Sequence, residues 1–272
     1  MQKIYIDSRF RTANSKSESD FNVELPRSFN VPDGVVAHID DIVIPVSWRT
    51  VDERNNKCYI SVFSGLNALL DTNFTLTPQN YDGTTFAAEL ATKLNIALAT
   101  FVPLPVMTCN YDILSGLLTI SMTDARTGTG NLPIYLQILT DDTLAFGSQK
   151  VVVPNTINTI LGNKHQTLIS VAAPYKGFVD LFNTRNLYLT SSALCSYDTV
   201  SNFGMDTIVK KIPCTASYNR MIFQSSGSTL DGLDVSKRTL RFLDFKLVDS
   251  SFRPIDLQGN HFSFSIVFVQ KR

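Results

Sequence analysis

The residues best suited to acid–base or metal chemistry in this chain are its three histidines, because a neutral imidazole accepts protons and binds metals near neutral pH. His38 falls in an expected strand, His165 in an expected loop, and His261 at the start of the last expected strand. Nucleophilic catalysis needs such a base beside a serine or cysteine, and nothing in the sequence brings a histidine to one. The motifs G-x-S-x-G and H-E-x-x-H do not occur. We therefore expect the histidines to be structural or surface residues.

The four cysteines, Cys58, Cys109, Cys195 and Cys214, are far apart in the sequence. They form no C-x-x-C pair, and no nearby histidine completes the ligand spacing of a zinc site. We therefore expect buried, reduced thiols, no bound metal and no cofactor.

Paired carboxylates could share a proton or a metal ion, and two such pairs occur. Asp40 and Asp41 are adjacent in an expected strand, so their side chains are expected on opposite faces and unable to share a ligand. Asp141–Asp142 fits the first turn of a short helix, where carboxylates are favourable. The Gly-rich stretch 126–131 lacks the lysine and the following helix of a phosphate loop and is expected to be an ordinary loop. Trp48 could line a sugar site, but a β core of this size buries aromatic residues routinely.

These observations predict no catalytic residues, and the chain is expected not to be an enzyme. One catalytic alternative stays open, a polysaccharide hydrolase, which requires two carboxylates about 5–10 Å apart on a concave face. The sequence does not identify such a pair.

The amino-acid composition limits the classes of protein to which this chain could belong. The chain has 272 residues, is 44% hydrophobic and carries no formal net charge, so it has enough apolar residues for a large core. The absence of net charge argues against a protein whose main function is to bind nucleic acid, because such binding needs clustered Lys and Arg. No apolar run reaches the roughly 18 residues of a membrane helix, and we expect no secretory signal.

Strand patterns dominate the chain. In 261–269, Phe262, Phe264, Ile266 and Phe268 fall on one face, and in 240–248 Leu243, Phe245 and Leu247 do the same. Period two places alternate side chains on opposite sides of a sheet, so these runs predict an antiparallel pair over one core. The other expected strands are 4–6, 21–25, 35–44, 57–63, 74–77, 117–122, 134–139, 186–190, 207–212 and 221–224. Many short strands separated by turn residues predict an all-β sandwich or barrel.

One segment has a helical period instead. Phe86, Leu90, Leu94 and Leu98 recur every four residues, with Thr84 or Thr85 as the expected N-cap. A short helical turn is expected over 140–146. We therefore expect an inserted α+β segment at 64–160 within a β-sandwich formed by 1–63 and 161–272.

Five stretches together carry a resemblance to a known family. In order they are YIDSRFRT with the following SDFNVELP, VVAHIDDIVIPVSWRTVDERNNKCYI, LTPQNYDGTTFAAELATKLNIAL, CNYDILSGLLTIS and LRFLDFKLVDSSFRPIDLQGNHFSFSIVF. Their order and spacing resemble the minor capsid (penton) proteins of virophages and polinton-like double-stranded DNA viruses. The resemblance covers most of the chain and is weakest between about 151 and 184.

The resemblance implies a jelly-roll β-sandwich that forms a homopentamer at each five-fold vertex of an icosahedral virion. It implies contact with the major capsid protein and an outward-facing insertion, which the 64–160 segment would supply. A host receptor or a vertex fibre is a further partner that it suggests. The family brings no catalytic residues, and the absence of a strongly basic N-terminal tail argues against direct contact with packaged nucleic acid.

A further functional alternative stays open at this point. The chain could be a carbohydrate- or receptor-binding β-sandwich module of a virion, with exposed aromatic and Asn or Asp side chains on one loop face.

The polar segment from Ser8 to Asp20 has two possible interpretations. It could be an arm that orders only against a neighbouring subunit, or a surface loop that is flexible in every state.

Overall fold

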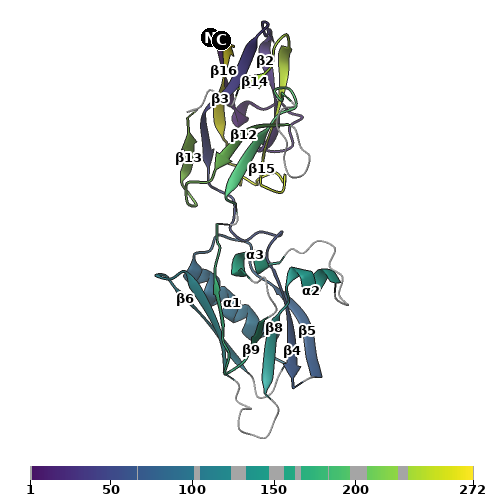
Figure 1. Cartoon of the computed structure of the whole chain (residues 1–272), viewed down its shortest axis with the longest axis vertical. Helices are drawn as coiled ribbons and strands as arrows, with labels where there is room; N and C mark the ends of the chain where they lie inside the picture. Colours follow the sequence, from purple (N-terminus) through teal and green to yellow (C-terminus); the bar gives the residue numbers. More distant parts are fainter. Residues whose placement is uncertain are drawn as a thin grey trace. The chain divides into compact units, whose positions relative to one another are not determined.

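The computed structural model describes residues 2–65, 67–100, 105–123, 133–146, 156–162, 167–182, 184–196, 207–225 and 232–271. The chain divides into two compact units, unit 1 (Met1–Trp48 with Thr184–Arg272) and unit 2 (Arg49–Asn183) (Figure 1). Each unit has its own cluster of buried apolar side chains.

Unit 1 consists of two antiparallel sheets. The first, called here the β1 sheet, has the order β1 (Gln2–Asp7), β16 (Ser263–Gln270), β3 (Val35–Pro45) and β13 (Met221–Gln224), with β14 (Leu233–Asp234) also paired to β3. The second, the β2 sheet, has the order β12 (Ile208–Pro213), β11 (Asn186–Thr190), β15 (Thr239–Val248) and β2 (Asp20–Asn30).

The strand order identifies unit 1 as a jelly roll. Four antiparallel pairs, β1–β16, β2–β15, β3–β13 and β11–β12, nest one inside the next along the sequence. A long hairpin rolled up in this way gives two facing sheets and covers most strand edges. The prediction of a mainly β fold with a jelly-roll sandwich is therefore confirmed. Unit 2 enters the chain between β3 and β11.

The core of unit 1 comes from the inward faces of both sheets. Phe245 of β15 lies against Phe264 of β16, with ring centroids 4.9 Å apart, and against Phe21 of β2, at 5.7 Å. The predicted pairing of 240–248 with 261–269 is therefore wrong, since β15 and β16 belong to different sheets and face each other across the core. Alternation identifies which face of a strand is buried but not which strand covers it. Burying each Phe contributes about 1.5–3 kcal/mol.

Unit 2 combines two smaller antiparallel sheets with helices. The four-stranded sheet has the order β5 (Asn67–Thr75), β4 (Lys57–Ser64), β8 (Ile134–Ile138) and β9 (Thr167–Ile169). The three-stranded sheet has the order β10 (Tyr175–Phe178), β7 (Leu117–Thr123) and β6 (Val106–Asp112). Its helices are α1 (Gly83–Ala97), α2 (Asp141–Phe146) and α3 (Asn158–Leu161).

Helix α1 forms where its four-residue period predicts, and Phe86, Leu90 and Leu94 are fully buried in the core of unit 2. Its N-cap is Asp82 rather than Thr84 or Thr85. The Asp82 carboxylate accepts a hydrogen bond from the Thr85 backbone N–H at 2.7 Å, and the Thr85 hydroxyl accepts one from the Asp82 N–H at 3.0 Å. This reciprocal capping box satisfies two backbone donors that the helix start leaves unpaired.

The bounds of unit 2 differ from the expected insertion at 64–160. Strand β4 lies outside that range in the sequence but pairs with β5 and β8, and β9 pairs with β8. Strand β10 likewise pairs with β7. Unit 2, which extends from Arg49 to Asn183, includes these strands because they complete its sheets.

Hydrogen bonds within the single chain hold the polar segment from Ser8 to Asp20. The Arg11 guanidinium binds Glu18 at 3.0 Å, and the Ser15 hydroxyl accepts from the Asn22 N–H at 3.0 Å. Both expectations for this segment, an arm ordered by a neighbouring subunit and a flexible surface loop, stay predictions.

Candidate interaction surface

Two of the three histidines, His38 and His261, lie within the described residues. His38 lies on β3 and packs against Gly232, and its Nδ1 is buried without a hydrogen-bond partner among the described residues. His165 lies outside the described residues. His261 directly precedes Phe262, at the entry to β16.

The fold does bring His261 to a serine, contrary to the sequence-based expectation. The Ser8 hydroxyl lies 3.2 Å from His261 Nδ1 and accepts a hydrogen bond from the Phe262 N–H at 3.1 Å. Ser8 and His261 are 253 residues apart in the sequence, and their contact joins the end of β1 to the start of β16. Ser8 is 0% exposed, so its oxygen offers no path for a substrate. The contact fastens the chain start to the last strand.

The four cysteines are free thiols, as expected. Cys58 and Cys195 are buried, and Cys109 and Cys214 are half-buried. Burial raises the pKa of Cys109 to about 12 and that of Cys214 to about 11, so neither thiol is activated as a nucleophile. No group of three metal-ligating side chains occurs among the described residues. The helices in the described part include none long and apolar enough to cross a membrane.

The carboxylates of Asp40 and Asp41 both bind the ammonium group of Lys3, so the prediction that they cannot share a ligand is wrong. Lys3 Nζ lies 3.2 Å from Asp40 Oδ2 and 2.9 Å from Asp41 Oδ2. A β-bulge in β3 opposite β16 explains this, since Asp41 has φ +46° and the register shifts between Ser263 and Ser265. An extra residue in a bulge redirects a side chain that strict alternation would place on the other face.

The carboxylate pair Asp141–Asp142 lies in the first turn of α2 as predicted, but Asp141 has a further role. Its Oδ1 accepts hydrogen bonds from Thr156 Oγ1 at 2.5 Å and from Asn158 Nδ2 at 2.8 Å. Thr140 caps the helix instead, accepting from the Thr143 N–H at 3.2 Å. The Gly-rich stretch 126–131 lies outside the described residues.

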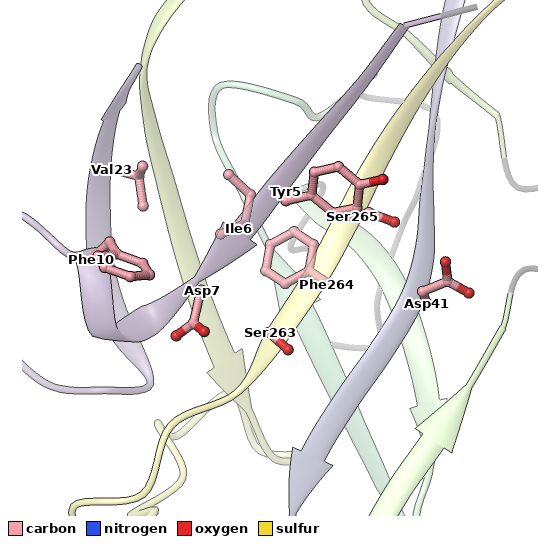
Figure 2. Close-up of a pocket in the computed structure, with 9 residues that line it drawn as sticks. All are labelled: Tyr5, Ile6, Asp7, Phe10, Val23, Asp41, Ser263, Phe264 and Ser265. Atoms are coloured by element: carbon pink, nitrogen blue, oxygen red, sulfur yellow. The ribbon is translucent and has the colours of Figure 1, made fainter. Parts of the chain in front are cut away.

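An open hollow of about 340 Å³ lies over β1 and its neighbours (Figure 2). Tyr5 and Phe10 line it and are 78% and 76% exposed, although large aromatic side chains are normally covered. Asp7 and Asp41 supply carboxylates to the same hollow. The figure shows Phe10 on one side of β1 and Asp41 on the other. The remaining lining residues are Ile6, Val23, Ser263, Phe264 and Ser265.

The carboxylates of the hollow are already matched by cations. Arg9 Nε donates to Asp7 Oδ2 at 3.0 Å, and these hydrogen bonds hold the pKa of Asp7 below its ordinary value. Lys3 binds Asp41 and lies 5.4 Å from the centroid of the Tyr5 ring. A glycosidase needs one carboxyl group whose pKa is raised, so that it can act as an acid. Asp7 shows the opposite shift, which argues against the hydrolase alternative at this position.

The sequence reasoning did not single out Tyr5 and Phe10 as surface residues. A signal was present, because Ile4 and Ile6 flank Tyr5, and alternation sends Tyr5 to the opposite face from both. No comparable signal distinguished Phe10. Trp48, by contrast, is buried in the core of unit 1 and lines no sugar site.

The opposite edge of the β1 sheet is also apolar and exposed. Met221 and Phe223 of β13 are 60% and 67% exposed, and Tyr218, in the turn that leads into β13, is also exposed. Arg220, also exposed, directly precedes Met221. Contiguous exposed apolar side chains of this kind mark contact sites in soluble proteins.

Unit 2 has an exposed apolar group of its own at the turn between β6 and β7. Ile113 and Leu114 project from the turn, and Phe178 of β10 is exposed beside it. Gly116 in this turn has φ +69°, and a Cβ there would lie 2.9 Å from the Phe178 ring. Glycine therefore lets the turn pack directly on the aromatic ring.

No family model and no curated protein sequence matches the chain. Among solved structures, a crystal structure of the mavirus penton protein matches with a TM-score of 0.53 and 9% sequence identity. The match covers 98% of this chain and 99% of the mavirus chain. The two proteins therefore share a fold, which extends over nearly the whole length of both.

Proposed function

We propose that this protein is a structural capsid protein, the pentameric vertex (penton) of an icosahedral virion of the virophage or polinton-like kind. The observation that carries the proposal is the fold shared with the mavirus penton protein over almost the whole of both chains. The five sequence stretches that resemble this family support it independently. The proposal assigns the protein no enzymatic activity.

A vertex protein needs surfaces for identical neighbours rather than a catalytic pocket. In a ring of five, each copy uses one surface to meet a different surface of the next copy. The jelly roll of unit 1 offers two such surfaces, one at each edge of the β1 sheet. Ser8, one partner of the Ser–His contact in unit 1, is fully buried, which agrees with a structural role.

The same proposal includes partners and location. The ring would contact the major capsid protein laterally, and unit 2 would be the insertion that faces outward, where a receptor or vertex fibre could bind. The protein would be located in the virion and make no direct contact with nucleic acid.

Electron microscopy of the purified chain tests the proposal. We expect class averages of closed rings with five-fold symmetry. Because the chain has no net charge, apolar burial should dominate the contacts, and moderate salt should preserve or strengthen the rings. Rings of another symmetry, or none at any protein concentration, would contradict the proposal.

A second candidate function, a carbohydrate- or receptor-binding module, is favoured by the hollow over β1. Exposed Tyr5 and Phe10 beside two carboxylates could stack on a sugar ring and accept its hydroxyl hydrogens. A glycan array separates the two candidates, because this function requires glycan binding that Tyr5→Ala abolishes.

A further inference from the structure

We propose that the two edges of the β1 sheet are the two surfaces that meet between copies of this chain. The β1 edge comprises Lys3, Tyr5, Asp7 and Phe10. The β13 edge comprises Tyr218, Arg220, Met221 and Phe223. The β1 edge of one copy contacts the β13 edge of the next, an assignment that rests on the proposed function because it names the contact within the ring.

Within the described residues of unit 1, both edges are open. Among the described residues β1 pairs only with β16, and β13 pairs only with β3. The outer backbone groups of an edge strand are available to another strand. Soluble proteins usually protect such edges with charged or proline residues. Lys3, Asp7 and Arg220 lie at the edges here, but each edge also carries large exposed apolar side chains.

The exposed apolar side chains of unit 1 are concentrated at these two edges. Among its described aromatic and methionine side chains, Phe242 is the one exposed example elsewhere, on β15 of the other sheet. Tyrosine, phenylalanine and methionine are enriched at the centres of protein interfaces, because they bury a large area at low entropy cost.

The two edges present these side chains on the same face of the sheet. Tyr5 lies opposite Ser265, and Ser263, two residues away on β16, lies on the same face. Val43 is opposite both Ser263 and Phe223, so Phe223 shares that face too. When the edges of two copies meet, Tyr5 and Phe223 become neighbours on one surface, where cross-strand aromatic pairs are stabilising.

The strand directions suit a head-to-tail contact. Each neighbouring pair in the series β1, β16, β3 and β13 is antiparallel, so β1 and β13 run in opposite directions. A copy rotated about an axis parallel to the strands keeps its strand directions, and its β13 therefore runs antiparallel to β1 of its neighbour. Two different surfaces meeting in this way produce a ring when the rotation closes.

The test uses two variants of the full chain, Tyr5→Asp and Phe223→Asp, whose masses are measured by light scattering over a concentration series. Each variant alone has one blocked and one intact edge, so its self-association constant should weaken by about 30-fold or more. Mixed in equal amounts, they can form a single type of contact, between intact edges. We expect a heterodimer of about 60 kDa, twice the chain mass, and no larger ring.

Phe242→Asp is the matched control, since it charges an exposed aromatic residue away from both edges and should leave the assembly unchanged. If the unmodified chain forms rings that both edge variants also form, the edge assignment is wrong and the proposed function stands. Self-dimers of either variant would also overturn it, because they require one surface to meet itself. If the unmodified chain forms no ring, both proposals fail.

Discussion

The two units of this protein are β-rich but are stabilised differently. Unit 1 has two facing sheets whose aromatic residues interlock, as in the contact between Phe245 and Phe264. Unit 2 has two smaller sheets and depends on α1, whose Leu90 and Leu94 are fully buried in its core. The two sheets of a sandwich cover each other's apolar faces, whereas a small sheet can bury its apolar face against a helix.

The units also differ in where they expose apolar side chains. In unit 1 the exposed aromatic and methionine side chains lie mainly at the two edges of one sheet, with Phe242 on the other sheet. In unit 2 the exposed apolar side chains are dispersed: one group lies at the turn between β6 and β7, and others, such as Ile96 and Leu168, lie on α1 and β9. Sheet edges extend along a strand and suit contact with another sheet, whereas a projecting turn suits a pocket in a partner. This contrast is the physical basis for assigning assembly to unit 1.

The largest expected effect comes from truncating one aromatic or aliphatic side chain in each core. Phe245→Ala should cost about 3–5 kcal/mol of unfolding free energy, and Leu90→Ala about 2–5 kcal/mol. Because the cores are separate clusters, each variant should lower the stability of its own unit. Hydrogen exchange followed by mass spectrometry reports the two units separately.

A single cooperative loss of protection across both units in either variant would contradict this independence. The conservative variants Phe245→Leu and Leu90→Met serve as controls and should show the same pattern at smaller amplitude.

Alanine substitutions at two glycines, one in each unit, should distinguish a loss of stability caused by a steric clash from one caused by backbone strain. A Cβ on Gly83 would lie 2.1 Å from the Tyr111 ring, so Gly83→Ala should cost about 1–3 kcal/mol. Gly259 has φ +76° and open space around it, so Gly259→Ala should cost about 1 kcal/mol through backbone strain alone. Urea denaturation measures both costs. The Gly83 cost should fall sharply in a Tyr111→Ala background, and an unchanged cost would exclude the clash as its cause.

The smallest expected effect concerns the cap of α1 and depends on pH. Hydrogen bonds from Thr85 lower the pKa of Asp82 in the folded state. The stabilisation is therefore present above the unfolded-state pKa and is lost as pH falls below about 4. Asp82→Ala should cost about 1 kcal/mol at pH 7, and the difference from the unmodified chain should shrink in acid. Asp82→Asn, an uncharged cap, should show little of this pH dependence.

The sequence predicts best those elements whose pattern is long and local. The alternation in β3 and β16 and the four-residue period of α1 placed these elements to within a few residues. Strands β6, β9, β10 and β14 were missed, since they are short or lack clear alternation. Most of β5 was also missed, because the expected strand at 74–77 overlaps only its last two residues. Their positions depend on partners distant in sequence.

The surface features were less accessible to sequence reasoning because each depends on tertiary structure. The bulge at Asp41 appears only when β3 and β16 are paired, and the contact between Ser8 and His261 joins opposite ends of the chain. Whether Tyr5 or Phe223 is exposed follows from their positions on edge strands. Alternation alone does not reveal which strands those are.

The mass of the unmodified chain in solution, measured by light scattering over a concentration series, tests the central claim most directly. A vertex protein that assembles in fives predicts a species of about 151 kDa, five times the chain mass of 30.2 kDa. Because assembly follows mass action, its population should rise with concentration. A mass of 30.2 kDa at every concentration, or a limiting species of any other size, would contradict the account.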